Sequence, residues 1–237
     1  MSLFVNDPSV PLPGWDGTRR NFVFLGEAGC GKSELAVNLA MRLAEKGDKE
    51  VHFFDLDMTK PLFRSREMAR PLTEKGIIVH FEEQFMDAPT TVGGPDLILR
   101  REDCYAVLDV GGDYIGARSI GQYAPLFRRP STAVYYIMNP YRPWSDTIDR
   151  IDAVLSDILT VSHLSLQELH LVGNPNLGDE TTAENYLDGC RMLRETVGPY
   201  KEIEFYCAEE SLSPSVAEEI EEWVMPMKLY FRYPWRD

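Results

Sequence analysis

The residues best suited to chemistry lie at positions 26 to 33 and read Gly-Glu-Ala-Gly-Cys-Gly-Lys-Ser. They match the phosphate-binding loop pattern G-x-x-x-x-G-K-S, between an apolar run and a run of helical periodicity, as that loop requires. Glycines let backbone N–H groups converge on a phosphate in front of the positive end of the following helix. An ordinary glycine-rich turn, the alternative, needs neither Lys nor Ser at these offsets. We expect Lys32 on the outer phosphates of a nucleotide, Ser33 on Mg²⁺, and further contacts from Gly26, Glu27, Ala28, Gly29, Cys30, Gly31 and Glu34.

Carboxylates follow two later apolar runs. The segment FFDLD ends in Asp55 and Asp57, and YAVLDVGGD contains Asp109 with Gly112 three residues later. Ligands of open α/β folds bind beyond the carboxyl ends of the strands, where these residues are expected. Asp55 and Asp57 can act on Mg²⁺ through its water shell or orient an attacking water, Asp109 can assist the metal, and the Gly112 N–H can reach a γ-phosphate. Polar caps of strand ends and a plain Gly-Gly turn are the alternatives.

These residues need elements that bring them to one edge, and the hydrophobic pattern predicts such elements. Short β-rich runs alternate with amphipathic stretches, as in residues 32–46, where Leu recurs at helical spacing before Gly47. This alternation predicts a parallel sheet with helices on both faces. The expected fold is a three-layer α/β/α P-loop NTPase with a mostly parallel, twisted sheet. The expected strands are residues 21–25, 51–56, 77–81, 105–110, 133–138, 168–173 and 203–208, and the expected helices are residues 32–46, 61–75, 115–127, 144–161, 181–196 and 215–224.

Length and composition predict a single nucleotide-binding domain over residues 1–237. No window approaches the roughly 18 to 20 consecutive apolar residues of a membrane span, and no basic region precedes a long apolar segment, so we expect a cytoplasmic protein without membrane attachment.

Residues 85–96, rich in Pro and Gly, are expected to form a surface loop. The aromatic tail from residue 225 is expected to pack onto the domain, because Pro226 and Pro234 interrupt any amphipathic helix.

The net charge and the spacing of the cysteines limit the classes of partner and metal site that the chain can have. A formal net charge of −14 repels nucleic acid and anionic lipid at long range, so we expect proteins or small molecules as partners and no nucleic acid. The four cysteines form no C-x-x-C pair, which argues against a disulfide framework and against a metal site within one chain. Buried thiols are expected, and an iron–sulfur or metal role shared between two chains is the alternative.

The segments GEAGCGKS, DLDMTKP, LDVGGD and LVGNPNLGDETT together resemble the MinD/ParA/CobQ-type P-loop proteins of the SIMIBI class, over most of the chain. The resemblance implies that Asp57 positions the hydrolytic water and that Asp55 lies nearer the metal. GTP-binding relatives use Asn-Lys-x-Asp, whereas this chain has Asn174 followed by Pro175. The resemblance therefore implies that this Asn-Pro pair contacts the base, with the amide of Asn174 reading adenine, and that ATP with Mg²⁺ is bound.

The chain departs from this family at Glu27, where many members carry a lysine that reaches across a dimer to the ATP of the partner. An acidic side chain beside phosphates is unfavourable unless it points away or meets an arginine. Arg64 and Arg66, which follow the D-x-D motif, could supply positive charge instead, or could be solvated on a helix face. The cysteine pattern of the metal-binding relatives and the basic terminal helix of the cell-division relatives are missing from the sequence.

The leading interpretation is an ATP-dependent, Mg²⁺-dependent ATPase switch that forms a nucleotide-dependent homodimer and acts on a protein partner. One alternative is a small-molecule kinase or ligase similar to dethiobiotin synthetase, with residues 85–96 and nearby arginines forming an acceptor pocket. Another is a nucleotide-binding module without turnover, which Glu27 keeps open.

Overall fold

Eight parallel strands form one sheet in the computed structural model, which describes residues 12, 15–57, 65–81, 94–112 and 114–231. Every strand pairing among these residues is parallel, so the sheet is wholly rather than mostly parallel. The order across the sheet is β3-β2-β4-β1-β5-β6-β7-β8. The strands are β1 (Asn21–Gly26), β2 (Glu50–Leu56), β3 (Ile78–Phe81), β4 (Cys104–Val110), β5 (Thr132–Met138), β6 (Leu169–Gly173), β7 (Ile203–Glu209) and β8 (Trp223–Met227).

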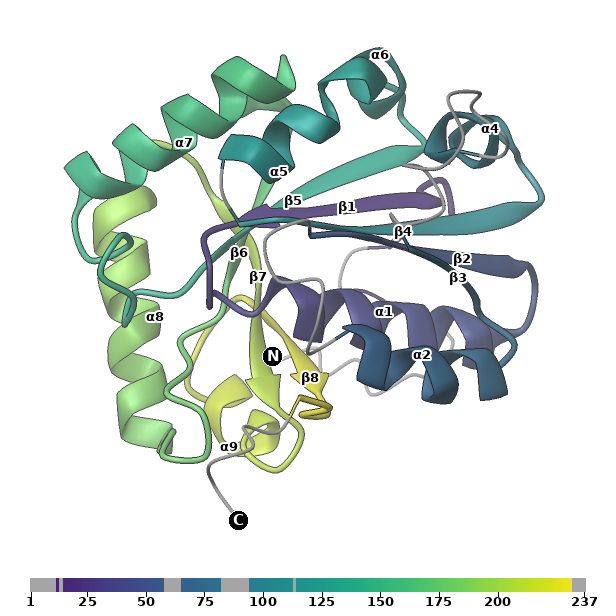
Figure 1. Cartoon of the computed structure of the whole chain (residues 1–237). Coiled ribbons are helices and arrows are strands. Elements are labelled where there is room, and N and C mark those ends of the chain that lie inside the picture. The colour runs from purple at the N-terminus through teal and green to yellow at the C-terminus, as the bar shows by residue number, and fades with distance from the viewer. Residues whose placement is uncertain (1–11, 13–14, 58–64, 82–93, 113, 232–237) are drawn as a thin grey trace.

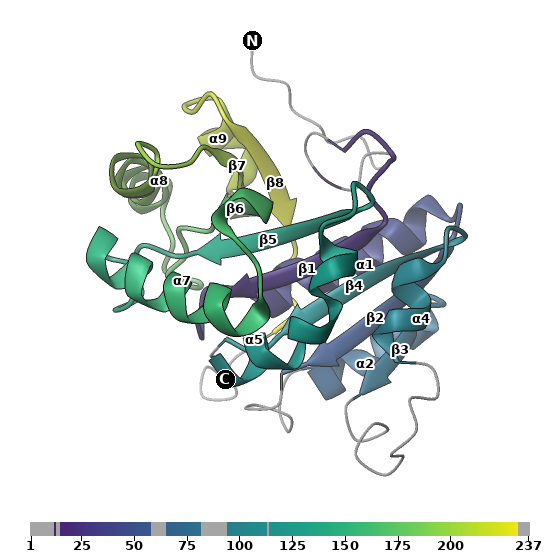
Figure 2. The ribbon, with the colours of Figure 1, turned by 90° about the horizontal axis from the view of Figure 1, so that it is seen from above.

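Helices cover both faces of the sheet, which gives the three layers seen in Figures 1 and 2. Two helices, α1 and α2, pack on one face, and α4 to α9 pack on the other. The α-helices are α1 (Lys32–Lys46), α2 (Ser65–Glu74), α4 (Pro95–Arg100), α5 (Tyr114–Ser119), α6 (Ala124–Phe127), α7 (Ile148–Ser162), α8 (Ala183–Val197) and α9 (Ser213–Ala217), and the 3₁₀ turns are η1 (Gly121–Tyr123) and η2 (Leu166–Glu168).

The central strands are apolar on both faces because both faces are covered. In β1, Phe22 and Phe24 enter the core beside α1, while Val23 and Leu25 enter the core on the opposite face. A period of two therefore divides one continuous apolar run between two cores. This explains why the sequence of the strand shows no alternation of polar and apolar residues.

The order of the strands places the loop at positions 26 to 33 at the carboxyl edge of the sheet, where the direction of the strand order reverses. The chain leaves β1 toward β2, with β4 lying between them, whereas β5 lies on the other side of β1. Ligands of open α/β folds bind at such a reversal, beyond the carboxyl ends of the strands. The carboxyl ends of β1, β2, β4, β5 and β6 therefore lie at one edge of the sheet.

The helix expected over residues 115–127 is wrong as a single element, because α5, η1 and α6 replace it. Pro125 lies in the first turn of α6, where the backbone N–H that proline lacks has no helical partner. At Gly121 a Cβ would lie 2.8 Å from the carbonyl oxygen of Val161 in α7. The break thus lets α7 approach this segment closely.

The helix expected over residues 215–224 is also wrong, and an eighth strand was missed. Helix α9 ends at Ala217, and β8 pairs with β7 through residues that include Pro226. Proline is tolerated there because β8 is an edge strand, with β7 as its one neighbour in the sheet. The tail does pack onto the domain as expected, since Tyr230 and Phe231 contact the core beside α1; residues 232–237 lie outside the described part.

Apart from α4 and η2, which were not expected, the other elements agree with expectation within a few residues, as element ends usually do. Helix α7 begins four residues later than expected, after a loop that contains Pro140 and Pro143, and α2 is described from Ser65 onward. Most of the loop expected over residues 85–96 lies outside the described ranges. Its last two positions begin α4, where Pro95 occupies the first turn.

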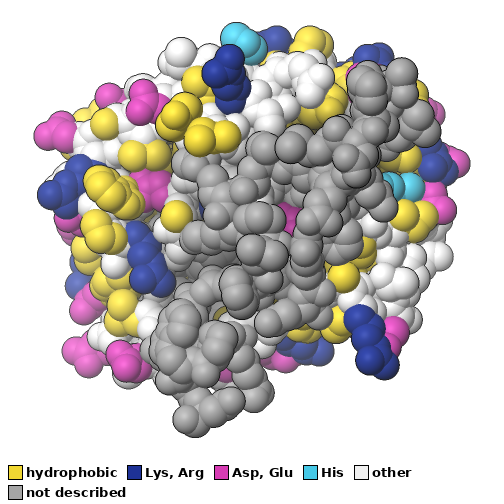
Figure 3. All heavy atoms as spheres, viewed as in Figure 1, with side chains coloured by type: hydrophobic (Ala, Val, Ile, Leu, Met, Phe, Trp, Pro, Cys, Tyr) yellow, Lys and Arg dark blue, Asp and Glu magenta, His cyan; other side chains and the backbone are white. Residues whose placement is uncertain are grey.

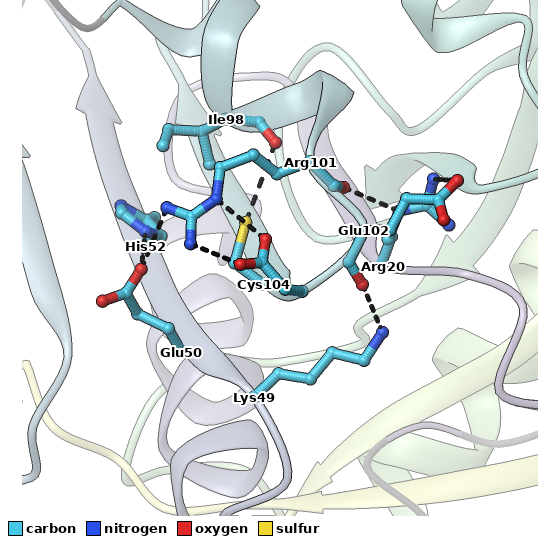
Figure 4. A network of polar contacts seen from close by, with 9 residues as sticks. Arg20, Lys49, Glu50, His52, Ile98, Arg101, Glu102 and Cys104 are labelled. Carbon is cyan, nitrogen blue, oxygen red and sulfur yellow. Dashed lines mark hydrogen bonds and ion pairs between the residues drawn. The ribbon is translucent and has the colours of Figure 1, made fainter.

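A polar network lies at the opposite edge of the sheet, where the strands begin (Figure 4). The Arg101 guanidinium pairs with Asp103 at 2.9 Å and with Glu50 at 3.1 Å, and Glu50 bonds His52 at 2.8 Å. The ion pairs of Arg101 are exposed, so each adds little stability. Cys104 lies in this network with its thiol toward a backbone carbonyl, and all four cysteines are buried and free, as predicted.

Charged side chains are dispersed over the surface drawn in Figure 3. On the described part of that face, Lys and Arg lie singly among Asp and Glu. None of the helices in the described ranges combines the length and the apolar composition that crossing a bilayer demands.

Candidate nucleotide-binding site

The glycines at the end of β1 adopt backbone conformations that other residues rarely reach. The φ angles of Gly26, Gly29 and Gly31 are 137°, 79° and 101°. A Cβ at Gly26 would also meet the Ile137 carbonyl oxygen of β5 and would lie 2.9 Å from Cys30 Sγ. Glycine is therefore required by both conformation and space, and the chain can curl into the concave loop that the sequence predicts.

Helix α1 begins directly behind this loop. Gly31 is its N-cap, and the Leu35 N–H donates to the Gly31 carbonyl at 3.0 Å. The next backbone N–H groups have no partner within the helix and point toward the loop, together with the positive end of the helix dipole. The helix ends at Gly47 in a left-handed cap, as the sequence predicts. A helix of 15 residues with this start is suited to binding an anion.

Lys32 turns back over the loop. Its ammonium donates to the Glu27 carbonyl oxygen at 2.8 Å, and the side chain is buried. Gly112, from the loop after β4, packs against the same place, since a Cβ there would lie 2.8 Å from Lys32 Nζ and 2.6 Å from the Ala28 nitrogen. Two of the predicted site segments thus meet at Lys32.

Asp109, at the carboxyl end of β4, is the most deeply buried acid of the site. Its exposed fraction is 0%, and neither carboxylate oxygen forms a hydrogen bond of normal geometry with a described residue, although the Ser33 hydroxyl is near enough to lower its pKa. Burial, and then the charge of Asp55, raises the pKa of Asp109 to about 7, while the Ser33 hydroxyl and Lys32 favour the charged form. Such a carboxylate beside a hydroxyl fits a cation, because a buried acid without well-formed hydrogen bonds is otherwise costly.

Two acids at the carboxyl end of β2, Asp55 within the strand and Asp57 directly after it, lie beside Asp109. In the parallel register Asp55 is opposite Asp109, and the Asp57 N–H donates to Asp55 Oδ1 at 3.3 Å. Within the described ranges, no three His, Cys, Asp or Glu side chains form a complete metal cage.

Asn174 ties the end of β6 to the phosphate loop. Its amide nitrogen donates to the Cys30 carbonyl at 2.8 Å, and it packs directly against Gly31. The Cys30 carbonyl can only accept, so it fixes which end of the amide faces the loop. The opposite atom, Oδ1, is buried without a hydrogen-bond partner in the described structure. Pro175 beside it packs against Gly189 of α8.

Glu27 points away from the exposed rim of the loop. Its side chain is 3% exposed, Oε2 lies 3.4 Å from Ser145 Oγ, and Oε1 has no partner among the described residues. Burial raises the pKa of Glu27 to about 6, against the opposing effects of Ser145 and Lys32. An acidic side chain beside phosphates is unfavourable unless it points away from them. The Glu27 carboxyl group meets this condition, because it is buried toward the loop after β5.

Two further predicted groups have other surroundings. The Glu34 carboxylate accepts from the backbone N–H groups of Tyr230 and Phe231, so it faces the C-terminal segment. Arg64 and the side chain of Arg66 lie outside the described part, and their proposed role stays a prediction. The site residues therefore converge from the ends of β1, β2, β4 and β6.

Sequence reasoning missed the loop after β5, residues 139–145. Arg142 in this loop donates from Nε to the Gly29 carbonyl at 3.0 Å, and Ser145 contacts Glu27. The segment reads NPYRPWS and carries no known motif. Its position was nevertheless a usable signal, because it follows a buried strand next to β1 and had to end at the same edge.

No protein-family model and no curated protein matches the sequence. Solved structures do match. The signal recognition particle 54 kDa protein of Aeropyrum pernix in complex with GDP is 16% identical with a TM-score of 0.49, and the match covers 83% of this chain and 43% of that one. FlhF complexed with GTP and Mg²⁺ is 15% identical with a TM-score of 0.46, over 83% and 69%. A nucleotide-binding protein of Archaeoglobus fulgidus in complex with ADP is 17% identical with a TM-score of 0.46, over 87% and 90%.

At these identities and TM-scores the matches support no statement about the activity of this chain. This chain spans less than half of the length of the first of them. The chain itself has a parallel sheet, a glycine-rich loop between β1 and α1 and a buried acid at the end of β4. The chain has the α/β fold of a P-loop NTPase.

Proposed function

We propose that this chain binds ATP with Mg²⁺ at residues 26–33 and acts as an ATPase switch on a protein partner. The observation that supports it most is Asp109, a fully buried carboxylate without a hydrogen bond of normal geometry to a described residue, beside Ser33 and Lys32. A buried acid of this kind would be a liability in a plain structural turn. Beside a loop that gathers N–H groups, it is a metal-binding group.

The chain's own residues divide the work of holding a nucleotide. The N–H groups of the loop and of the first turn of α1 bind phosphate oxygens, and Lys32 exchanges its bond to the Glu27 carbonyl for a bond to phosphate. Ser33 and Asp109, with Asp55 beside them, would hold Mg²⁺, which neutralises phosphate charge when bound. Asp57, less buried than Asp55, orients the attacking water.

Asn174 supports ATP rather than GTP as the nucleotide. Its amide nitrogen is engaged by Cys30, so the buried Oδ1 is the atom left to accept a hydrogen bond. Adenine presents an amino donor at the position where guanine presents a carbonyl acceptor, and two acceptors repel each other. The 6-amino group of adenine can therefore donate to Oδ1, whereas the 6-carbonyl oxygen of guanine at the same position cannot.

The switch would use the segment after β4. Gly112 packs on Ala28 and Lys32, and the chain then enters α5, which contacts α7. A γ-phosphate that accepts from the Gly112 N–H would hold this segment, and hydrolysis would release it.

We further propose that ATP promotes formation of a homodimer. Sedimentation of the variant Asp57→Asn, which is expected to hydrolyse ATP slowly, should show a dimer with ATP and a monomer with ADP.

Calorimetry with Mg²⁺ and ATP tests the central proposal. Wild-type protein should release heat on ATP binding, Lys32→Ala should abolish it, and Asp109→Asn should remove the dependence on Mg²⁺ while the protein remains folded. Heat that survives Lys32→Ala would contradict binding at this loop. Phosphate release that is slow and rises with protein concentration would support the switch.

The alternative of a small-molecule kinase depended on residues 85–96, of which 85–93 lie outside the described part. The same turnover assay distinguishes it. Turnover that appears only after a metabolite is added would replace the switch with a transferase, and ATP that stays intact over long incubation would leave a binding module.

A further inference from the structure

The loop of residues 139–145 forms a wall beside the phosphate loop. It connects β5 to α7 and touches the phosphate loop at two points, one through Arg142 and Gly29 and one through Ser145 and Glu27. Ala28 and Gly29 are exposed on this side, whereas Cys30 is buried. The wall therefore borders the open rim of the nucleotide site.

Backbone bonds make this wall rigid. The Arg142 N–H donates to the Asn139 carbonyl at 3.0 Å, and the Arg142 carbonyl accepts from the Ser145 N–H at 3.0 Å. Asn139 is itself buried, and its amide donates to the Asn176 carbonyl at 2.8 Å. The backbone of Arg142 is thus held by its bonds to Asn139 and Ser145, and Asn139 is held in turn by Asn176 in the loop after β6. A side chain carried in this way loses little conformational freedom when it binds a ligand.

The Arg142 guanidinium is anchored by one nitrogen only. Nε donates to the Gly29 carbonyl at 3.0 Å, and the group lies within 4 Å of the position of a Cβ on Gly29. None of the described residues accepts a hydrogen bond from Nη1 or Nη2. Four N–H donors in a planar fork therefore remain available at the rim, and such a fork matches the oxygens of a phosphate.

Charge balance favours phosphate as the ligand of this fork. Lys32 is the one cation in the loop, whereas Asp55, Asp57 and Asp109 crowd the opposite side of it. A nucleotide adds further negative charge to a chain whose net charge is already −14. A second fixed cation lowers the free energy of binding at such a place.

Glu27 holds the wall that carries Arg142. It is buried between the phosphate loop and Ser145, which is also buried, and the acidic residue near it is Asp146, directly after the wall. A lysine here could not accept a hydrogen bond from the Ser145 hydroxyl. Where many members of the family that the sequence resembles carry a lysine, this chain has Glu27. Its carboxylate can accept a hydrogen bond from Ser145 and so hold residues 139–145 in place.

We propose that Arg142 is a second phosphate-binding cation of this site, presented in cis by residues 139–145, and that Glu27 is the positioning residue that fixes that loop. This inference rests on the proposed nucleotide binding and adds to it the source of the charge that the missing lysine would have supplied. Arg142 binds phosphate oxygen through its Nη groups while Nε stays on Gly29.

The first test measures nucleotide affinity by calorimetry with Mg²⁺ and ATP. Arg142→Gln should weaken binding about tenfold or more, because it removes charge-assisted hydrogen bonds. The dependence of its dissociation constant on KCl concentration should also become shallower than in wild type. Arg142→Lys should recover part of the affinity, and Arg191→Gln, which removes an exposed arginine of α8, should match wild type. Equal affinity and equal salt dependence of Arg142→Gln and wild type would overturn the inference.

A double-mutant cycle tests the role of Glu27. Glu27→Ala should weaken ATP binding in wild type and should have little further effect once Arg142→Gln is present, because both changes remove the same contact. Glu27→Gln, which keeps an acceptor for Ser145, should retain most of the affinity. Additive effects of Glu27→Ala and Arg142→Gln would show that Glu27 does not act through Arg142.

The outcomes separate this inference from the proposed function. ATP binding that depends on Lys32 but not on Arg142 overturns the second cation and leaves nucleotide binding standing. A wild-type protein that gives no Lys32-dependent heat overturns both. Thermal unfolding of each variant shows whether a loss of affinity reflects a lost contact or a lost fold.

Discussion

A methyl group at Gly112 would collide with the backbone of the phosphate loop at Ala28 and with the Lys32 ammonium. Its Cβ would lie 2.6 Å from the Ala28 nitrogen, which belongs to the backbone and cannot move aside as a side chain can. Gly112→Ala should therefore push the segment after β4 away from the phosphate loop. We expect about a tenfold loss of affinity for ATP, from overpacking of 1–3 kcal/mol, and a smaller loss for ADP.

Competition binding with both nucleotides checks this expectation. Gly94→Ala is the control, since a Cβ at Gly94 meets nothing within 4 Å. Equal losses for ATP and ADP would show that Gly112 does not respond to the γ-phosphate.

Asn174 is the residue that we propose reads adenine. We expect wild type to bind ATP more tightly than GTP, and Asn174→Ala to reduce the ratio of the two affinities toward one, by about tenfold for one lost hydrogen bond. Fluorescent ATP and GTP analogues would measure the ratio. A preference that persists in Asn174→Ala would place the reading of the base elsewhere.

The conformation of the phosphate loop could be predicted from the sequence, whereas its contact with the loop after β5 was missed. Residues 26–33 follow a spacing that the chemistry of phosphate binding demands. Arg142 was missed because its role depends on where β5 ends and on the surroundings of Glu27, which no local pattern encodes. The burial of the Glu27 carboxyl group likewise depends on Ser145, more than a hundred residues away in the sequence.

Among the elements, α1 links the phosphate loop to the C-terminal segment. The Asn38 amide donates to the Lys228 carbonyl at 2.9 Å and accepts from the Lys228 N–H at 2.8 Å. Asn38→Ala would leave both backbone groups without these partners and should lower the free energy of unfolding by about 2 kcal/mol.

Urea denaturation measures that change. Gln122→Ala, which removes an exposed amide with one long bond to a backbone carbonyl, should be close to neutral. If the two variants lose equal stability, the two hydrogen bonds between Asn38 and the backbone of Lys228 do not contribute measurably to the free energy of unfolding.

Elements with strong local signals were predicted well. Helix α1 has both ends where the sequence places them, because a glycine cap closes it and the phosphate loop opens it. The segments that failed are set by tertiary contacts. The acidic residues before Trp223 favour a helix locally, whereas the pairing of Trp223–Met227 with β7 makes that segment a strand.

For the molecule as a whole, a histidine pair links stability to pH. His52 Nδ1 lies 2.9 Å from His80 Nε2, and His80 stacks on Phe54. Burial, and then the charge of His52, lowers the pKa of His80 from 6.5 to about 4. Between these two values the unfolded chain binds the proton and the folded chain does not. The stability that His80 contributes is therefore present above pH 6.5 and is lost as the pH falls toward 4.

His80→Gln removes this titration and keeps a polar partner for His52. We expect the free energy of unfolding of wild type to fall more steeply between pH 6.5 and 4.5 than that of the variant, as about 1.4 kcal/mol per pKa unit is the upper limit for such a group. Urea titrations at a series of pH values give both curves. The raised pKa of Glu27 acts in the opposite direction, but equally in both proteins. Parallel curves would contradict the assignment.

The position of Pro226 restricts how copies of this protein can join. It lies in β8, one of the two outer strands, and offers no N–H to an incoming chain. Growth of the sheet from one molecule into the next, the route by which exposed strands start fibrils, is disfavoured on that side. Replacing this proline with a β-branched residue would remove that safeguard against insoluble assemblies.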